Sequence, residues 1–478
     1  MTASLWTSDE LVKATRGNLH GPAFEISDLV IDSRKVTPGC LFVALPGERV
    51  DGHDYVDTAL EAGAAAALVS RIPDGLDSTA SLLEVEDVLG GLTDIAVAAR
   101  ARASAKVLAV TGSVGKTGTK DSLAAALAAF GSVHASAGNL NNHIGAPLSL
   151  ARLPKDADYA VLELGMNHLG EISDLTRLVR PDLAIITNVE ETHIGHFRDL
   201  EQIAEAKSEI FEGLEKDSGL AVLNRDNAHF YFCADKAEAA GARIVSFGRS
   251  EDADVRLIGA ECGPDGSNIV IRVDGKQLVY RIDGIGMHWA FNSVGVLACI
   301  HALGLDLNKA ATAIRDVTAK AGRGRQEEIA FGEMGLLLID ESYNASPASV
   351  AAALEVLSMT KPKGQGRRIV VLGDMLELGE RSEFLHLNLL AKVCGSADLV
   401  FTVGPMMDRM GRNLPPMLFG GHGATSDELA ELVADQLSDG DVVLVKGSLG
   451  MAMAPIVSAI RDLADSNQIT PPSAAYGG

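Results

Sequence analysis

VLAVTGSVGKT, residues 107–117, is an apolar run followed by a glycine-bearing loop that ends in Lys116 and Thr117. The Ala-rich segment 121–129 that comes next is typical of a helix. A strand, a glycine loop and a helix in this order direct backbone N–H groups at a phosphate, and the helix N-terminus adds positive potential. The stretch therefore predicts a phosphate-binding loop inside a parallel α/β unit.

The loop differs from the general nucleotide-binding pattern because Val110 stands where that pattern has a glycine. In such a loop Lys116 reaches the β- and γ-phosphates and Thr117 binds Mg²⁺. A guanine-specific protein would carry NKxD after a later strand, whereas residues 308–311 read NKAA, so we expect ATP as the ligand. The residues expected to contact ATP here are Gly112, Ser113, Val114, Gly115, Lys116, Thr117 and Gly118.

Apolar runs that alternate with helical segments continue along the chain and predict parallel sheets. Strands are expected at 29–31, 41–45, 107–110, 159–164, 183–189, 220–223, 336–339, 369–372, 399–403 and 442–445. Asp274-Gly275 predicts a β-hairpin within residues 267–284. The predicted fold class is α/β with three domains: a small α/β domain at 1–102, a central P-loop parallel-sheet domain at 103–320, and a Rossmann-like domain at 321–470 without GxGxxG. A disordered tail is expected at 471–478.

Length and charge limit the kind of protein this can be. At about 150 residues per domain, 478 residues suggest roughly three domains. The 64 acidic and 41 basic residues give a net charge of −23, which argues against nucleic acid or an anionic membrane as the main partner. The cysteines form no CxxC pair, and residues 1–11 lack the basic and apolar regions of a signal peptide. We expect a cytoplasmic monomer with reduced thiols and no membrane insertion.

Short motifs are spread over nearly the whole chain. In order they are DSRKV (32–36), PG (46–47) with DGH (51–53), GNLNNHIG (138–145), ELGMNH (163–168), DESYNASP (340–347), GDMLELG (373–379) and VKGS (445–448). Each motif alone is unspecific, but together and in this order they resemble those of the Mur ligases, the ATP-dependent amide-forming enzymes of peptidoglycan synthesis. The resemblance implies an N-terminal UDP-substrate domain, a central P-loop ATPase domain and a C-terminal Rossmann-like ligase domain.

Within the family, the motifs are most similar to the branch that adds D-alanyl-D-alanine to UDP-N-acetylmuramoyl tripeptide through an acyl phosphate. The branch that adds the third residue usually carries DNPR, which is absent here. Folylpolyglutamate synthetases lack the DSR and DGH segments of the first domain. Two alternatives stay open: a Mur-type ligase that adds a single amino acid, and a non-catalytic P-loop protein that uses ATP as a switch.

Polar residues follow two apolar strands where open α/β sheets bind ligands, at Glu163 and His193. Lys207, taken alone, lies among glutamates on a solvated helix face. The resemblance implies that these three residues serve two Mg²⁺ ions, with Lys207 carbamylated so that it becomes an oxygen ligand. The implied catalytic residues are Lys116, Glu163, His193 and Lys207, and the implied metal ligands are Thr117, Glu163, His193 and Lys207.

The resemblance also assigns residues to the nucleotide and the substrates. Asn292 is expected near adenine, although an asparagine that opens a helix is also a common N-cap. Either Arg323 or Arg325 is expected to reach an ATP phosphate. Further ATP contacts are expected at Asp340, Tyr343 and Asn344, and Asp374 and Lys446 are expected near the dipeptide. The implied contacts to the UDP-sugar and muramoyl parts are Ser33, Arg34, Asp51, Gly52, His53, Asn139, Asn142 and His143.

Two segments depart from the family's usual motifs. The family's phosphate loop usually continues GKTT, whereas Gly118 follows Thr117 here. The family's DDSYNANP is DESYNASP here, which places Glu341 and Ser346 at the changed positions. Because glutamate keeps the charge of aspartate, we expect altered local geometry rather than lost activity.

Overall fold

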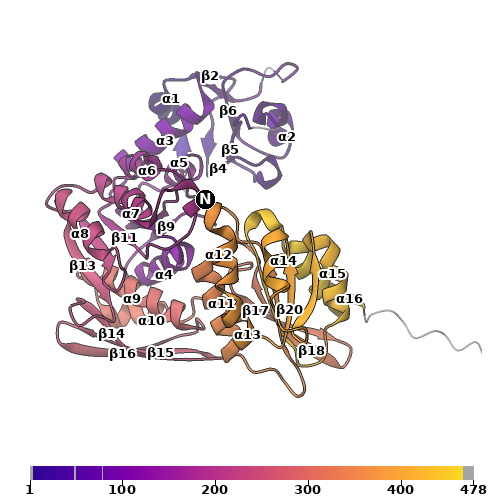
Figure 1. The fold of residues 1–478 in the computed structure, drawn as a ribbon. Helices are drawn as coiled ribbons and strands as arrows, with labels where there is room; N and C mark the ends of the chain where they lie inside the picture. Colours follow the sequence, from indigo (N-terminus) through magenta and orange to yellow (C-terminus); the bar gives the residue numbers. More distant parts are fainter. Residues whose placement is uncertain (1–3, 48–49, 78, 467–478) are drawn as a thin grey trace, which may run out of the picture.

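Four sheets organise the part of the chain that the computed structural model describes, which is residues 4–47, 50–77 and 79–466 (Figure 1). Their strand order confirms the predicted α/β class, with a large sheet in each of three successive regions. The tail expected at 471–478 lies outside the described residues. None of the helices in the described ranges combines the length and the apolar run that crossing a bilayer requires.

The N-terminal region contains a five-stranded sheet in the order β2-β7-β6-β5-β4, which is parallel except for β2. β1 and β3 form a separate antiparallel pair. Because β4 and β5 are parallel neighbours, the loops that follow them lie at the same edge of the sheet. The elements are β1 Trp6–Thr7, α1 Ser8–Thr15, β2 Asn18–His20, β3 Glu25–Ile26, β4 Asp28–Val30, β5 Cys40–Val43, α2 Val56–Glu61, β6 Ala66–Val69, β7 Leu82–Glu84 and α3 Val88–Arg102.

The central region has nine strands in the order β16-β15-β14-β13-β12-β11-β8-β10-β9, parallel from β9 to β14 and antiparallel through β16. The predicted hairpin is confirmed, and its turn residues Asp274 and Gly275 both have positive φ. The strands are β8 Lys106–Thr111, β9 Val133–Ala135, β10 Tyr159–Glu163, β11 Leu183–Ile186, β12 Leu220–Asn224, β13 Arg243–Gly248, β14 Val255–Gly263, β15 Gly266–Val273 and β16 Lys276–Ile282. The helices are α4 Lys116–Ala128, α5 Gly145–Ala151, α6 Glu171–Val179, α7 Leu200–Ser208, α8 Phe230–Ala239, α9 Met287–Ala302 and α10 Leu307–Ala313.

The C-terminal region has six strands in the order β17-β18-β22-β19-β20-β21, of which only β17 is antiparallel to its neighbour. The edge strands β17 and β21 are absent from the strands expected from apolar runs. The strands are β17 Arg325–Phe331, β18 Met334–Glu341, β19 Arg368–Gly373, β20 Leu399–Val403, β21 Phe419–Gly423 and β22 Val442–Lys446. The helices are α11 Pro347–Met359, α12 Ser382–Leu387, α13 Leu390–Ser396, α14 Pro405–Gly411, α15 Ser426–Asp435 and α16 Ala454–Ser466.

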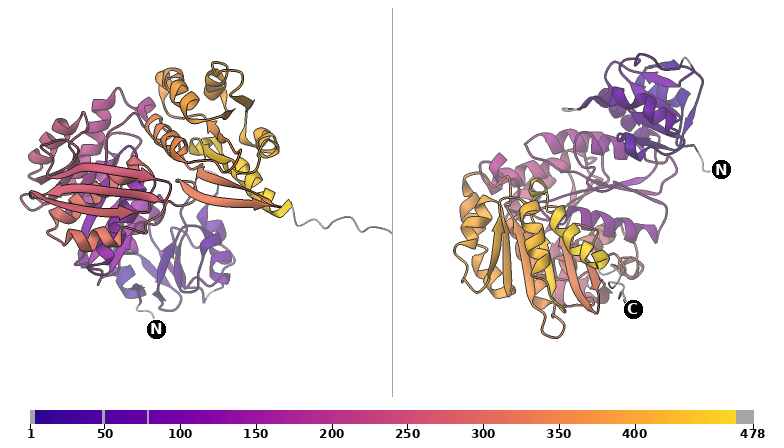
Figure 2. Two further views of the ribbon diagram at one scale, coloured as in Figure 1. Left: turned by 90° about the horizontal axis from the view of Figure 1, so that it is seen from below. Right: turned by 90° about the vertical axis from the view of Figure 1, so that its right-hand side faces the viewer.

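The N-terminal region packs on one end of the central region, and the C-terminal region lies beside the central one (Figures 1 and 2). The first junction is held by Trp6, whose indole Nε1 donates to the Ala151 carbonyl oxygen at 2.9 Å. The Arg102 guanidinium lies 3.2 Å from the centroid of the same ring. Such a cation–π contact joins the end of α3 to the first strand of the chain.

Burial of the central strand β8 can be tested by making a cavity. Leu108 is 0% exposed, so Leu108→Ala removes buried methyl groups and should lower the free energy of unfolding by about 2–5 kcal/mol. Val279 on the edge strand β16 is 68% exposed, and Val279→Ala should change it by no more than about 0.5 kcal/mol. Urea denaturation measures both values, and equal losses would contradict the placement of β8 in the core.

Candidate active site

The phosphate loop is shorter than the general pattern because β8 continues through Thr111. Val110 is therefore a buried strand residue, paired with Glu163 of β10 and Ile185 of β11, and the loop begins only at Gly112. Gly112 has a φ of +151°, and a Cβ on it would lie 1.8 Å from the Thr187 hydroxyl oxygen. Packing of the loop against the end of β11 thus requires glycine at this position.

Two amides of the loop are used to hold its shape. Ser113 N and Val114 N donate to the backbone and side-chain oxygens of Asn188, at 3.1 and 3.0 Å. The first turn of α4 supplies the remaining donors, because the first N–H groups of a helix have no intrahelical acceptor. Lys116 Nζ donates to the Gly112 carbonyl oxygen at 2.8 Å, so its side chain lies along the loop. The motif analysis did not identify Asn188.

Glu163 is only 1% exposed and both of its carboxylate oxygens accept hydrogen bonds. The Thr117 hydroxyl donates to Oε2 at 2.8 Å, and Asn141 Nδ2 donates to Oε1 at 2.7 Å. Thr117 belongs to the phosphate loop and Asn141 to the motif that contains Asn139 and Asn142. The carboxylate therefore ties these two segments together. Asn141 is a further residue that sequence reasoning missed, although it lies inside the GNLNNHIG motif.

Lys120 binds the chain just before Asn139–Asn142 and is also absent from the sequence-based predictions. Its side chain is 0% exposed, and Nζ donates to the Ser136 and Gly138 carbonyl oxygens at 2.7 and 3.0 Å. The Asp121 carboxylate lies 3.4 Å from the same ammonium and pairs with Lys320 at 2.7 Å. One buried lysine thus couples α4 to the chain that leads into Asn139–Asn142.

His193 follows β11 in the left-handed region, with a φ of 61°, and its Nδ1 is hydrogen-bonded to the carboxylate of Glu377. Burial lowers the pKa of His193 and outweighs the opposing effect of Glu377. Lys207 is 3% exposed, and within the described ranges its ammonium has no hydrogen bond or ion pair. Burial, followed by the nearby charge of Lys116, lowers the pKa of Lys207 well below its usual value.

These donors suit Mg²⁺ only in part before a ligand arrives. Among the described residues, no three His, Cys, Asp or Glu side chains already form a group that could hold a metal ion. Thr117 and Glu163 supply a hydroxyl and a carboxylate beside the phosphate loop. Mg²⁺ is commonly bound by one or two carboxylates together with substrate phosphates and water, so the site fits this ion when a nucleotide completes it.

A cleft of about 960 Å³ lies between the central and C-terminal regions, and most of the residues predicted to contact the nucleotide line it. Predicted residues that line it are Ser113, Val114, Gly115, Lys116, Thr117, Gly118, Asn139, Asn142, Glu163, His193, Asn292, Arg323, Tyr343, Asn344 and Lys446. Predicted residues that do not line it are Gly112, His143, Lys207, Arg325, Asp340, Asp374 and the N-terminal set Ser33, Arg34, Asp51, Gly52 and His53. Gly112 lies directly under the loop, as its contact with Thr187 shows.

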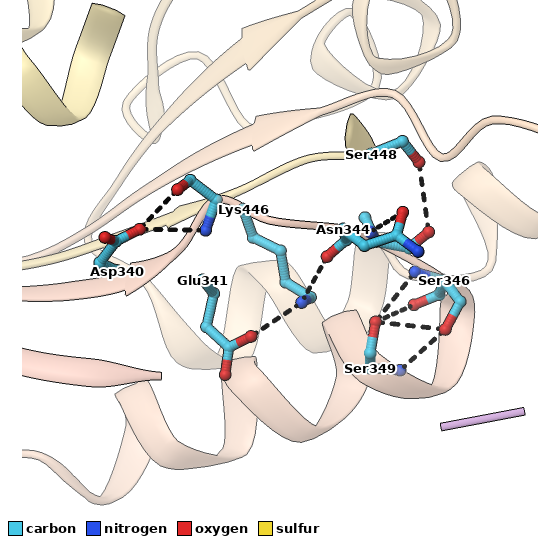
Figure 3. Close-up of polar contacts among 9 residues, drawn as sticks. Asp340, Glu341, Asn344, Ser346, Ser349, Lys446 and Ser448 are labelled. Atoms are coloured by element: carbon cyan, nitrogen blue, oxygen red, sulfur yellow. Dashed lines mark hydrogen bonds and ion pairs between the residues drawn. The ribbon is translucent and has the colours of Figure 1, made fainter. Parts of the chain in front are cut away.

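The C-terminal wall of the cleft is ordered by Lys446 (Figure 3). Its ammonium is nearly inaccessible and donates to Glu341 Oε2 at 3.0 Å and to the Asn344 carbonyl oxygen at 2.9 Å. The glutamate that departs from the family motif therefore reaches the lysine directly. Ser346, the other departure, caps α11 together with Ser349, and serine is as good an N-cap as asparagine.

Two predicted acidic residues, Asp340 and Asp374, contact other protein groups and do not line the cleft. The Asp340 carboxylate accepts from the Ser342 hydroxyl at 2.6 Å and lies 3.3 Å from Arg461 (Figure 3 shows Asp340). Asp374 accepts from the amides of Met406 and Met407 at the start of α14, which makes it a helix cap. These contacts account for both buried carboxylates without a ligand.

The two arginines that the sequence left open have different positions. The Arg323 guanidinium lies 4.0 Å from the centroid of the Tyr343 ring at the cleft. Arg325 begins β17 and lines a separate cavity of about 280 Å³. Asn292 lies within α9 against the loop, since a Cβ on Gly115 would come within 2.9 Å of its side-chain amide. It is therefore not the N-cap of that helix, which is Gly286.

The N-terminal set gathers at the edge where β4 and β5 end. Asp51 accepts from His53 N at 2.9 Å and from His53 Nδ1 at 2.7 Å, and it pairs with Arg71 at 2.9 Å. The hydrogen bonds from His53 hold the pKa of Asp51 well below its usual range. His53 Nε2 accepts from Ser70 N, so both ring nitrogens are used to join two loops. Arg34, whose side chain is 87% exposed, remains accessible at this edge.

The geometry defines a class: a P-loop nucleotide-binding protein whose cleft is completed by a second α/β domain. Three family models match the chain: "Mur ligase family, catalytic domain" at residues 25–89, "Mur ligase middle domain" at 110–300 and "Mur ligase, glutamate ligase domain" at 324–449. The chain belongs to the Mur ligase family, as the motifs predicted, and is an ATP-dependent ligase.

Individual relatives cover almost the whole chain. The Escherichia coli (strain K12) protein named UDP-N-acetylmuramoyl-tripeptide–D-alanyl-D-alanine ligase is 34% identical, with 95% of this chain and 98% of the relative covered. The Bacillus subtilis (strain 168) protein of the same name is also 34% identical, over 96% and 98%. A crystal structure of MurF from Acinetobacter baumannii matches with a TM-score of 0.81 and 29% identity, over 96% of this chain and 99% of that one. The Thermotoga maritima MurF ligase, solved in complex with ADP, has a TM-score of 0.75 and 26% identity, over 92% and 98%.

The role of Lys120 can be tested by removing its charge. Lys120→Met leaves the Ser136 and Gly138 carbonyl oxygens without their donor, which should cost about 1–3 kcal/mol of unfolding free energy and loosen residues 136–142. Lys106→Met removes an exposed lysine paired with Asp182 and should cost at most about 1 kcal/mol. Hydrogen exchange with mass spectrometry measures the loop, and unchanged protection there would contradict this role.

Proposed function

We propose that this chain joins D-alanyl-D-alanine to UDP-N-acetylmuramoyl tripeptide at the expense of ATP. The observation that carries the proposal is the hydrogen-bonded junction at Glu163, which joins the phosphate loop to the Asn139–Asn142 segment on one cleft. This junction would bring a nucleotide phosphate next to a second substrate. Relatives that are 34% identical over nearly the whole chain bear the name of this reaction.

The reaction has two steps. The terminal carboxylate oxygen of the tripeptide attacks the γ-phosphorus of ATP, and the bond from that phosphorus to the β-phosphate oxygen breaks. The products of this step are an acyl phosphate and ADP. The neutral amino nitrogen of D-alanyl-D-alanine then attacks the acyl carbon. The tetrahedral intermediate collapses to an amide as phosphate departs, and the nitrogen releases one proton to water. Lys116 and the amides at the start of α4 offset the negative charge that accumulates on the transferring group. Arg323, from the other side of the cleft, adds a further positive charge.

We assign Mg²⁺ binding to Thr117, Glu163, His193 and Lys207, with two ions as the expected number. When bound, Mg²⁺ neutralises phosphate charge and orients the γ-phosphate for attack. Lys207 fits this role only after carbamylation, in which its neutral amine adds to CO₂ with loss of a proton. Burial lowers the pKa of Lys207, and this shift favours the neutral amine that the reaction with CO₂ requires.

The substrates occupy different regions in this proposal. Ser33, Arg34 and Asp51 hold the UDP part at the edge where β4 and β5 end, with His53 and Gly52 shaping the loop. Asn139, Asn142 and His143 face the muramoyl part, and Tyr343 and Asn344 line the nucleotide cleft. Reaction requires these regions to approach one another, so we expect domain closure during turnover. ATP and UDP-linked precursors place the reaction in the cytoplasm.

Phosphate release by the purified chain tests the assigned reaction. With Mg-ATP and UDP-N-acetylmuramoyl tripeptide, release should require D-alanyl-D-alanine, and mass spectrometry should show the UDP-muramoyl pentapeptide. Lys116→Ala should lower kcat by about 10²–10³-fold, because a main source of charge stabilisation is lost. Lys106→Ala, at the opposite end of β8, should leave it unchanged. Release that needs a single amino acid and a shorter UDP-peptide would show that the assigned step is wrong, and release independent of any acceptor would contradict ligation.

Carbamylation of Lys207 gives a separate prediction. A neutral amine reacts with CO₂, so the lowered pKa should allow carbamate to form at a lower pH than at an ordinary lysine, and its occupancy should rise as pH rises. With ¹³C-labelled bicarbonate, the wild-type chain should show a carbamate resonance that Lys207→Arg abolishes. Lys236→Arg, at a half-exposed lysine on α8, is the control and should retain the resonance. Absence of the resonance in wild type would contradict this assignment.

A further inference from the structure

Glu377 reaches from the C-terminal domain into the metal site that the central domain contributes. It lies in the loop after β19, and its carboxylate hydrogen-bonds His193 Nδ1, on the loop after β11. Both residues line the cleft. No sequence motif assigned a role to Glu377, although it belongs to the GDMLELG segment.

The contact is part of a built junction between the two domains. Gly195 N donates to the Glu377 carbonyl oxygen at 2.8 Å, so backbone as well as side chain meets the loop. A Cβ on Gly195 would lie 2.7 Å from Gly379 N, which shows how closely the two chains approach. Arg381 forms an ion pair with Glu191 beside this point. Glu377 itself has a φ of 62°, and its side chain extends from the C-terminal domain to His193 of the central domain.

A histidine that binds a metal usually donates its other ring N–H to a carboxylate, which sets the tautomer and the ring orientation. Here Nδ1 is taken by Glu377, which leaves Nε2 as the nitrogen with a free lone pair. We propose that Glu377 is a positioning residue that prepares His193 to bind the metal ion, and that it does so only when the C-terminal domain is closed on the central one. This inference rests on the metal site in the proposed function.

Glu377 and His193 lie on different domains, so their contact depends on how the two domains are placed during turnover. Opening of the cleft would separate Glu377 from His193, so the metal site would lose its orienting carboxylate at the same time as the C-terminal wall withdraws. Closure would restore both together. Tight binding of a metal ion by His193 would then be a property of the closed form, which links cation affinity to domain position.

Binding of Mn²⁺ tests this without requiring turnover. Mn²⁺ replaces Mg²⁺, adenylyl imidodiphosphate replaces ATP, and electron paramagnetic resonance measures the free ion. Glu377→Gln removes the charge at nearly constant size and should weaken nucleotide-dependent Mn²⁺ binding by about 10–100-fold. Glu380→Gln, at an exposed carboxylate in the same loop, should leave the affinity within about twofold. Thermal unfolding checks that each variant folds, and Glu377→Asn, which tolerates positive φ, is the second variant.

Arg381→Ala distinguishes orientation of His193 by Glu377 from general attachment of the two domains to each other. It removes the neighbouring interdomain ion pair with Glu191 and leaves the contact between Glu377 and His193 in place. Its effect on Mn²⁺ affinity should be much smaller than that of Glu377→Gln. A double variant gives the second readout: His193→Gln with Glu377→Gln should bind Mn²⁺ no more weakly than His193→Gln alone, since Glu377 acts through that ring.

Three results would overturn the inference: wild-type affinity in Glu377→Gln, equal losses in Glu377→Gln and Arg381→Ala, or additive losses in the double variant. Failure of the wild-type chain to bind Mn²⁺ with the nucleotide would instead remove the proposed metal site, and this inference with it. Failure of D-alanyl-D-alanine to act as acceptor leaves all of these measurements intact, so the two proposals fail separately.

Discussion

The register between β8 and β10 is the constraint on which the site depends. Glu163 pairs with Val110, so its carboxylate emerges one residue before the point where β8 becomes the phosphate loop. A shift of one residue would turn Glu163 to the other face of the sheet and break its bonds to Thr117 and Asn141. The register is held by apolar residues: Leu108, Val161 and Leu162 are all fully buried. The position of the Glu163 carboxylate is thus determined by hydrophobic packing deeper in the strand.

Sequence reasoning succeeded where function depends on local order along the chain. The strand–loop–helix pattern around Lys116 is local, and the carboxyl ends of parallel strands meet at one edge, so the amino-acid sequence alone places Glu163 beside the phosphate loop. The edge strands were harder. β21 reads FGGHG, where glycines replace the apolar run that signals a strand, and in β17 only Ile329 and Phe331 are buried. Both strands exist because a neighbouring strand supplies hydrogen bonds, which no local pattern encodes.

The contacts that sequence reasoning missed are those made by groups whose partner is distant. Lys120 looks like an ordinary polar helix residue, yet it is fully buried, and the Ser136 and Gly138 carbonyl oxygens accept hydrogen bonds from its ammonium. Glu377 meets His193 across 184 positions of sequence, and only the relative placement of two domains brings them together. Conversely, Asp340 and Asp374 lie in motifs, but their carboxylates contact other parts of the protein. Asp340 contacts Arg461 and Ser342, and Asp374 accepts hydrogen bonds from the first amides of α14. A motif marks a segment, and the structure decides which of its side chains face the ligand.

Cationic side chains lie in the cleft, although acidic residues outnumber basic ones along its lining as they do in the whole chain. Lys116, Arg323 and Lys446 line the cleft, and Lys207 is buried near Lys116. The charge of Lys116 lowers the pKa of Lys207, which means that the two ammonium groups repel. A nucleotide phosphate would offset Lys116, and carbamylation would convert the neutral amine of Lys207 into an anion. Each change reduces the same repulsion, and the carbamate then needs a cation of its own. Assembly of the nucleotide, the metal and the modified lysine is therefore expected to be mutually reinforcing, and the Glu377–His193 contact adds domain closure to that set.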